Sequence, residues 1–347
     1  MADPTVMGRA IAVAGQYRTH PNPRVGAVFV DDDGLVVGVG FHTGPGSDHA
    51  EVMAISSAGD RAAGATMYVT LEPCNHHGRT PPCVDAIVAA GITHVVVGTV
   101  DPDNRVSGSG ISALIDASVK VTAWDSPGEV EAVDPGYFLH RRTGLPRVTL
   151  KYAMTLDGSV AAQDGTSRWI TGDAAREDVH LLRSGVDAVV VGAGTLRQDD
   201  PGLDVRLRGY EGAQPRPVVI AGAEPLPDDA RLIASAPLLI TTARGPAWNS
   251  VEAVVVEGDR YPDPVASARA LADYGYLDIL LEGGPTVASA WWKAGLVSRG
   301  VAYLGAKVGG GLGSAPLAGA FASITDALDV EIVDVRRIGS DVRIEFH

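Results

Sequence analysis

The sequence predicts two α/β domains, the first of them an α/β/α sandwich. At 347 residues the chain is too long for one ordinary hydrophobic core. Short apolar runs alternate with helical segments along its whole length, an order typical of a sheet covered by helices on both faces. We therefore expect one domain over residues 1–145 and a second over residues 146–347.

The first domain opens with an expected β-hairpin. Residues 25–30 and 35–41 are apolar and flank the turn sequence Asp31, Asp32, Asp33 and Gly34. Two further apolar runs predict strands over residues 66–71 and 94–100. Helices are predicted over residues 49–58 and over 81–90, where the second helix begins with two prolines and stops at Gly91.

The second domain is predicted to follow an interdomain connection. Between residues 125 and 146 the apolar periodicity fades into segments rich in proline and glycine. Apolar runs beyond it predict strands over residues 147–153, 186–191, 217–221, 238–241, 277–281, 301–304, 330–337 and 342–346. Helices are expected near residues 173–183 and 285–294.

Charge and hydropathy narrow the class of partner. The net charge of −14 disfavours nucleic acid and anionic membranes, although a local pair of arginines can still bind the phosphate of a small molecule. No segment approaches the ~20 apolar residues of a membrane span, and the first residues lack the features of a secretory signal. We therefore expect a cytoplasmic protein, in which two cysteines favour a metal or catalytic role over a disulfide.

Four residues in the first half have the composition of a catalytic zinc site. His49, Cys74 and Cys83 provide one imidazole and two thiolates, and three such ligands leave a fourth tetrahedral position open for water. Glu51 follows the histidine by two residues and is expected to move protons rather than to bind the metal. Cys83 lies near the start of the helix predicted at residue 81, where the helix dipole favours a thiolate.

The spacing of the cysteines leaves alternatives open. Zinc deaminases typically combine His-x-Glu with Pro-Cys-x-x-Cys, whereas eight residues separate Cys74 from Cys83 here. Either the longer spacer is an insertion that contacts substrate, or the cysteines are ordinary buried thiols. A further alternative has His76 or His77 as a metal ligand.

Several motifs resemble the family of bifunctional riboflavin-biosynthesis deaminase-reductases. The resemblance extends over nearly the whole chain and is carried by residues 21–26, 40–42, 49–52, 68–83, 101–102, 151–158, 167–171, 194–196, 199–206 and 282–286. The eight-residue spacer is that family's own version of the motif. The resemblance implies a cytidine-deaminase-like sandwich, a second domain with a dihydrofolate-reductase-like fold, one zinc ion in each chain, and NADPH as the reductant.

The resemblance also assigns roles to matching positions. It implies that His49, Cys74 and Cys83 bind zinc, that Glu51 shuttles protons, and that Asn22, His42, His76 and Asn104 contact the deaminase substrate. In the second domain it implies cofactor contacts at Ala153, Trp169, Thr195, Asp199, Gly284, Pro285, Thr286, Val287, Ala288, Ser289 and Ala290. It further implies substrate contacts at Ser167, Arg183, Leu203, Arg206 and Glu282.

The residues of the second domain, taken by themselves, are less specific. Gly283 and Gly284 lie between a predicted strand and a helix, which suits a ligand phosphate but equally suits a plain turn. No G-x-G-x-x-G fingerprint follows the first strand of either domain. The glycine-rich stretch 309–313 is interpreted as either a ligand loop or a mobile turn.

Four side chains of this domain have competing interpretations. Arg183 and Arg206 are candidates to clamp a phosphate, with surface ion pairs as the alternative. Trp169 either packs on nicotinamide or fills the core. Lys151 either faces the substrate or points to solvent.

The leading functional hypothesis is two successive reactions on a phosphorylated diaminopyrimidine ribonucleotide, first deamination and then reduction by NADPH. A second hypothesis is a stand-alone base or nucleoside deaminase whose second half binds a ligand without reducing it. A third is a zinc-stabilised binding module with no activity. From the family we also expect a homodimer or higher homo-oligomer.

Overall fold

The computed structural model describes residues 2–78, 81–245, 248, 251–311, 313–319, 323, 325 and 327–347. Arg79 and Thr80, in the spacer between the two cysteines, lie outside these residues. The chain forms two compact units, Met1–Gly144 and Leu145–His347. Among the described helices, none is both long and apolar enough to cross a bilayer.

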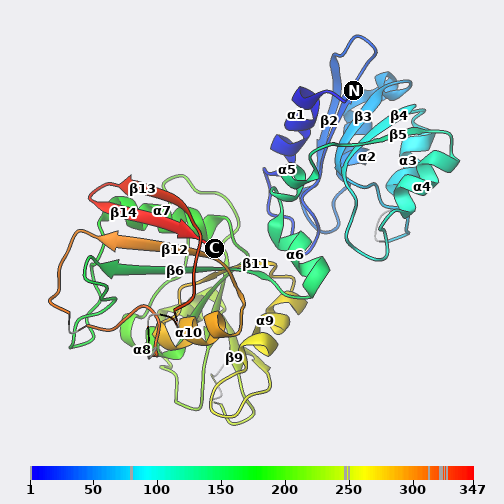
Figure 1. Ribbon diagram of the computed structural model, residues 1–347. Coiled ribbons are helices and arrows are strands. Elements are labelled where there is room, and N and C mark those ends of the chain that lie inside the picture. The colour runs from blue at the N-terminus through cyan, green and yellow to red at the C-terminus, as the bar shows by residue number, and fades with distance from the viewer. Residues whose placement is uncertain are drawn as a thin grey trace. The chain divides into compact units, whose positions relative to one another are not determined.

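The first unit is built on one five-stranded sheet of order β2-β1-β3-β4-β5 (Figure 1). The hairpin strands β1 and β2 pair antiparallel, β1 also pairs antiparallel with β3, and β3, β4 and β5 are parallel. The strands are Gly26–Val30, Val36–Phe41, Thr66–Leu71, His94–Thr99 and Lys120–Ala123 for β1 to β5. The helices are Pro4–Ala14, Ala50–Ala58, Cys83–Ala89, Ser109–Asp116, Pro127–Glu131 and Pro135–Thr143 for α1 to α6, with a 3-10 turn at Gly59–Ala62.

Glycines on opposite sides of the hairpin let two helices approach the sheet closely. A Cβ on Gly26 would come within 2.2 Å of the Ala10 carbonyl oxygen of α1. Gly40 pairs with Ala27, the neighbour of Gly26, and therefore faces the other side, where a Cβ would lie 2.1 Å from the Ala50 carbonyl oxygen of α2. Helices thus cover both faces, which confirms the predicted α/β/α sandwich.

The second unit contains a nine-stranded sheet of order β10-β9-β8-β7-β11-β6-β12-β14-β13. Its strands β6 to β14 are Arg147–Thr155, Ala188–Gly192, Arg216–Ile220, Leu238–Thr241, Glu252–Val255, Asp278–Leu281, Val297–Gly305, Ile332–Ile338 and Asp341–Phe346. Its helices α7 to α10 are Asp173–Ser184, Ala193–Asp199, Pro264–Asp273 and Pro285–Lys293, with a 3-10 turn at Arg231–Ser235. Only β14 and β13 run antiparallel to their neighbours among these strands.

Side chains of alternate residues in the central strands pack into two hydrophobic cores, one on each face of this sheet. Val190 and Leu281 pack in the core that contains Trp291 of α10. Val189 and Leu280 point the other way, into the core that contains Leu196 of α8. The carboxyl ends of β6, β7 and β11 consequently meet at one edge, where parallel sheets commonly bind ligands.

Two predictions of local structure need correction. The expected connection over residues 125–146 is wrong for most of its length, because α5 and α6 occupy it and bury Val130 and Tyr137 in the first unit. The helix predicted from residue 81 begins at Cys83, with Pro82 as its N-cap. The prediction also omitted β5 and β10, two short strands in which no residue is fully buried.

Candidate active sites

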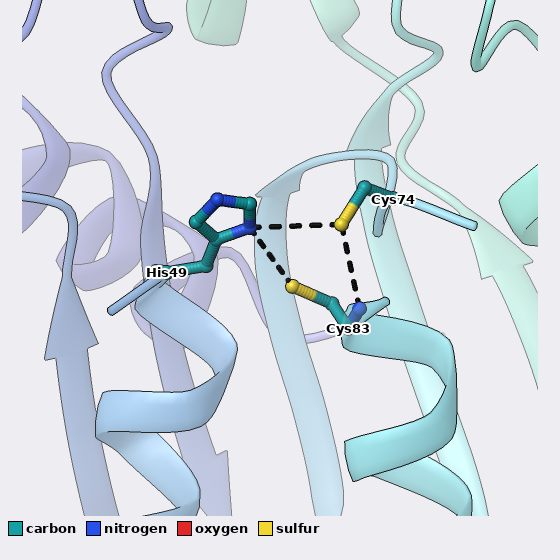
Figure 2. A group of neighbouring side chains, drawn as sticks. All are labelled: His49, Cys74 and Cys83. Atoms are coloured by element: carbon teal, nitrogen blue, oxygen red, sulfur yellow. Dashed lines mark hydrogen bonds between the residues drawn. The ribbon is translucent and has the colours of Figure 1, made fainter. Parts of the chain in front are cut away.

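The three predicted zinc ligands lie at the ends of three different elements. His49 is the N-cap of α2, Cys83 is the first residue of α3, and Cys74 lies in the loop that follows β3. Figure 2 shows the imidazole and both sulfurs pointing toward one another. The alternative of two unrelated buried thiols does not describe this arrangement.

The distances between these side chains suit a tetrahedral zinc ion. The Nδ1 atom of His49 lies 3.1 Å from the Cys83 sulfur and 3.6 Å from the Cys74 sulfur. Ordinary Zn–N and Zn–S bond lengths at tetrahedral angles place such ligand atoms roughly 3.5 Å apart. All three ligand atoms lie within 4.8 Å of one another, so one ion can contact them all. Neither His76 nor His77 belongs to this group.

The electrostatics of the two thiols are coupled. The pKa of Cys74 falls to about 4, first because the Cys83 thiol donates to its sulfur and then because His49 donates as well. The same pairing, together with burial, raises the pKa of Cys83. Two sulfurs that share one proton this closely are a favourable donor set for a cation that can replace the proton.

Glu51 is a buried carboxyl group beside the three ligands. It is only 3% exposed, and burial, followed by the charge of Cys74, raises its pKa to about 7. It does not belong to the group of converging ligand atoms. The Glu51 carboxyl therefore lies beside the three candidate ligands, hydrogen-bonded to Cys83, without being one of them.

A cavity of about 340 Å³ opens on this group and is lined by Glu51, Asn22, His42 and His76. The Asn22 amide donates to Nε2 of His42 at 3.0 Å, while Nδ1 of His42 faces the Asp48 carbonyl oxygen at 3.0 Å. This pattern fixes the proton of His42 on Nδ1 and orients Asn22.

The other two predicted contacts of this cavity differ in placement. Nδ1 of His76 is buried and has no hydrogen-bond partner among the described residues, so it is available to a ligand. Asn104, in contrast, is exposed and is not among the residues that line the cavity.

One carboxylate that lines this cavity, Glu72, was not predicted from the sequence. Glu72, next to Pro73 in the loop before Cys74, is 3% exposed and accepts four backbone amides. The donors are Asp101 at 3.2 Å, Gly108 at 2.9 Å, Gly110 at 2.9 Å and Ile111 at 3.2 Å. These bonds hold the loop after β4 against the metal-binding loop. No periodic pattern in the sequence marks such a role, because all four donors lie at least 29 residues away.

Asp101 and Tyr137 also line the cavity and were not predicted. The Tyr137 hydroxyl donates to both Asp101 oxygens, at 3.0 and 3.2 Å. Tyr137 comes from α6, in the segment interpreted as a connection, so the prediction could not have placed it here.

The second unit has a larger cavity, of about 600 Å³, at the carboxyl ends of β6, β7 and β11. Many of the predicted residues line it, namely Lys151, Ala153, Ser167, Trp169, Arg183, Thr195, Asp199, Arg206, Glu282, Gly284 and Pro285. The remaining part of the predicted cofactor segment, Thr286, Val287, Ala288, Ser289 and Ala290, continues along α10 and is not among the lining residues. Leu203 is buried in the adjacent core, although Gly202 beside it lines the cavity.

Glu282 joins two cations in the wall of this cavity. Its carboxylate receives two hydrogen bonds from Arg183, at 2.6 and 3.1 Å, and one from Lys151 at 3.4 Å. Burial alone would raise the pKa of Glu282, but Arg183 and Lys151 together outweigh it and lower the pKa to about 2. The side chain of Lys151 is only 19% exposed, so the interpretation that it points to solvent is wrong.

Trp169 and Arg206 lie at the more exposed side of the cavity. Trp169 is 59% exposed, which rules out a core role, and its ring packs under the Arg176 guanidinium at 4.5 Å. Arg206 pairs with Asp204 at 2.5 Å, and Arg183 is held by Glu282. Both arginines therefore have ion-pair partners in this structure. The Ser167 hydroxyl donates to Asp199 at 3.2 Å.

Comparison with known protein families and structures identifies both domains. Residues 1–99 match the family described as the cytidine and deoxycytidylate deaminase zinc-binding region, and residues 146–344 match the RibD C-terminal domain. The matched domains are a zinc-binding deaminase and an NADPH-dependent reductase.

Relatives match along the whole chain. The riboflavin biosynthesis protein RibD of Mycobacterium tuberculosis is 40% identical over 340 residues, which cover 97% of this chain and 94% of that protein. The structure of Acinetobacter baumannii RibD superposes with a TM-score of 0.90 at 34% identity, covering 98% of this chain and 97% of that chain. A deaminase/reductase structure from Thermotoga maritima gives a TM-score of 0.86 at 33% identity, with 99% and 97% coverage.

With both family models matched and relatives aligned from end to end, the chain belongs to the RibD family of bifunctional riboflavin-biosynthesis deaminase-reductases.

Proposed function

We propose that the first unit deaminates 2,5-diamino-6-ribosylamino-pyrimidinone 5'-phosphate and that the second reduces the ribosyl group of the product to ribityl. The observation that carries the first step is the convergence of His49, Cys74 and Cys83 beside the buried carboxyl of Glu51. The printed name of the Thermotoga maritima relative, a diaminohydroxyphosphoribosylaminopyrimidine deaminase and 5-amino-6-(5-phosphoribosylamino)uracil reductase, supports the substrate class.

In the deaminase cavity, we assign His49, Cys74 and Cys83 as the zinc ligands. Zinc bound there would supply Lewis acidity, which would make water a nucleophile at neutral pH. Glu51 takes the proton that is released and returns it to the departing ammonia. Burial keeps this carboxyl away from bulk water, so the proton stays within the cavity.

The walls of the cavity orient the pyrimidine. The hydrogen bond to His42 holds Asn22 at the cavity wall, and His76 offers a buried nitrogen that has no hydrogen-bond partner within the described part of the chain. Both are suited to the amino and carbonyl groups of the ring. Asn104 would reach the substrate only from the rim, since it is exposed.

In the reductase cavity, NADPH supplies the hydride for the ribosyl carbon. We assign its binding to Ala153, Trp169, Thr195, Asp199, Gly284 and Pro285, which line the cavity, and to residues 286–290, which follow along α10. Trp169, 59% exposed, is accessible to the nicotinamide. We assign substrate binding to Ser167, Arg206, Arg183, Glu282 and Lys151, which line the cavity. We also assign it to Leu203, on the family resemblance alone, since its side chain is buried in the adjacent core. The Arg183–Glu282–Lys151 network places charges of both signs at the cavity wall, where they can hold a polar sugar in one orientation.

One assay tests both steps. The diaminopyrimidine ribonucleotide is supplied with zinc-loaded protein and NADPH, and ammonia release and NADPH absorbance are followed together. One ammonia and one oxidised NADPH per substrate are expected. Ammonia without loss of NADPH would reduce the second unit to a binding domain, and no ammonia from a zinc-loaded protein would refute the proposed deamination.

We further propose a cytoplasmic homodimer. The two cysteines are free thiols in the structure, as expected in a reducing compartment. Strand β13 is the outermost described strand of its sheet and exposes Ile332 and Val335, each 59% exposed. An exposed apolar edge of this kind is normally covered.

The sequence of β13 is complementary to itself. Asp334 and Arg336 flank Val335, so antiparallel pairing of two copies about Val335 places each Asp334 opposite the Arg336 of the other copy. Val335→Lys would place two cations face to face at the twofold axis. We expect this variant to weaken dimerisation at least about tenfold, measured by light scattering over a dilution series. Leu181→Lys, at another exposed apolar residue of the unit, is the control. An unchanged dimer in Val335→Lys would exclude this interface.

A further inference from the structure

Asp157 has no role in the proposed reactions, yet its carboxylate accepts hydrogen bonds from three successive glycine amides. The backbone amides of Gly309 and Gly311 each lie 3.0 Å from a carboxylate oxygen, and that of Gly310 lies 2.7 Å away. The Thr155 hydroxyl donates to the same carboxylate at 2.5 Å. These hydrogen bonds keep the pKa of Asp157 well below its usual range, with the Thr155 hydroxyl as the largest cause and the glycine amides next, so the carboxylate is charged.

The glycines are required for this geometry. Gly310 and Gly311 have φ values of 93° and 83°, in the left-handed region that other residues rarely adopt. Successive amides in such a conformation form a concave row that binds an anion. Here the anion is a side chain of the protein itself, 152 residues earlier in the chain.

Both flanks of this contact reach the wall of the reductase cavity. On one side, the Leu156 amide donates to the Lys307 carbonyl oxygen at 2.8 Å, and the Lys307 ammonium donates to the carbonyl oxygen of Trp169. On the other side, Ser314 pairs with Val160 and Ala161 through bonds of 2.8 and 3.1 Å. Ser314, Val160, Ala161 and Trp169 all line the cavity.

We propose that Asp157 is a positioning residue of the reductase, which holds Gly309–Gly311 so that the cavity wall is formed before the ligands bind. A run of glycines has high conformational freedom when nothing holds it. If the run were released, ligand binding would have to order it, and apparent affinity would fall with the fraction of molecules in the competent state. Asp157 itself is not among the residues that line the cavity, so its effect passes through the loop.

Asp157→Asn tests the proposal with little change of shape. The amide replaces one acceptor oxygen by a donor that faces the glycine amides. We expect KM for NADPH to rise about tenfold with a much smaller change in kcat, since binding is impaired and chemistry is not. Deamination by the same protein should stay unchanged. The expected rise in the KM for NADPH rests on the proposed contact of Trp169 with the cofactor.

Two variants and one control refine the test. Gly310→Ala, strained at its φ of 93°, should reproduce the KM effect from the other side of the contact. Asp157→Glu retains the charge and should recover part of the affinity. Asp164→Asn is the matched control, because Asp164 is also an exposed aspartate but accepts from Thr166 within its own turn, at 2.7 and 2.9 Å. Its KM should equal that of the parent protein.

Amide hydrogen exchange provides a readout that does not depend on the reductase assignment. In Asp157→Asn, exchange at Gly309–Gly311 should be at least about tenfold faster than in the parent and control proteins. Unchanged exchange would show that the carboxylate does not hold the loop. Faster exchange with unchanged KM for both NADPH and the pyrimidine substrate would overturn the positioning role. Failure of the reductase proposal instead appears as an absence of NADPH oxidation in the parent protein.

Discussion

Replacing Glu51 by glutamine is expected to lower ammonia release by about 10²- to 10⁴-fold, the range of a lost general acid-base catalyst. Glutamine has nearly the same shape as glutamate but cannot exchange a proton at neutral pH. Since Glu51 lies outside the group of converging ligands, one zinc per chain should remain bound. Zinc content measured with ammonia release, in the same preparation, checks both parts.

Cys83→Ser is the counterpart of this variant. It removes one of the three converging ligands, so both zinc and ammonia release should be lost. Reduction of the separately supplied deaminated intermediate should persist in both variants and shows that the chain is folded. Normal turnover in Glu51→Gln would refute the role of Glu51. Loss of zinc in Glu51→Gln would show that the carboxyl helps to hold the metal.

Replacing Glu282 by glutamine is expected to have a comparably large effect on the second unit. The change leaves Arg183 and Lys151 as cations in a largely buried wall, where the Glu282 side chain is 8% exposed. Lowering a carboxyl pKa from 4.5 to about 2 corresponds to about 3 kcal/mol of stability, similar to the cost of breaking a buried ion pair. Because the same network orients the proposed substrate, kcat/KM of the reductase should fall about 10²-fold or more.

The stability difference has a defined dependence on pH. The folded-state pKa of Glu282 lies below the unfolded value. The parent protein therefore exceeds Glu282→Gln in free energy of unfolding by the full amount above pH about 4.5, and this difference is lost as the pH falls toward 2. Chemical denaturation of both proteins between these pH values measures it. Glu252→Gln removes an exposed pair with Arg216, at 2.9 Å, and should cost less than about 1 kcal/mol. Equal stability of Glu282→Gln and the parent at pH 7 would contradict the prediction.

The deaminase site could be predicted from the sequence because its signals are local. His49 and Glu51 are two residues apart, and Cys74 and Cys83 follow a strand and begin a helix. Helix starts and strand ends are marked by short-range features such as prolines and apolar runs. These features identified the residue types, and the convergence of the three ligand atoms supports the zinc chemistry that they suggested.

The reductase site illustrates the opposite case. Arg183 was recognised as a candidate, but the sequence left open whether it is free or ion-paired, because its partner Glu282 lies 99 residues away. The segment 125–146 was interpreted as a connection because its apolar residues are few. Val130 and Tyr137 are nonetheless buried in the first unit, with Tyr137 bonded to Asp101 36 residues earlier. Pairing over such separations depends on how elements pack.

The sequence by itself determined the two α/β domains, the strands of the sheet interiors and the candidate residues for the zinc site. Each of these follows from hydrophobic periodicity or from residue chemistry within a few positions. Only the tertiary structure decided that Glu72 holds the loop after β4, that Glu282 neutralises two cations, and that Asp157 anchors Gly309–Gly311. The physical reason is that each carboxylate finds its donors where folding brings them, and local sequence carries no record of donors that lie tens of residues away.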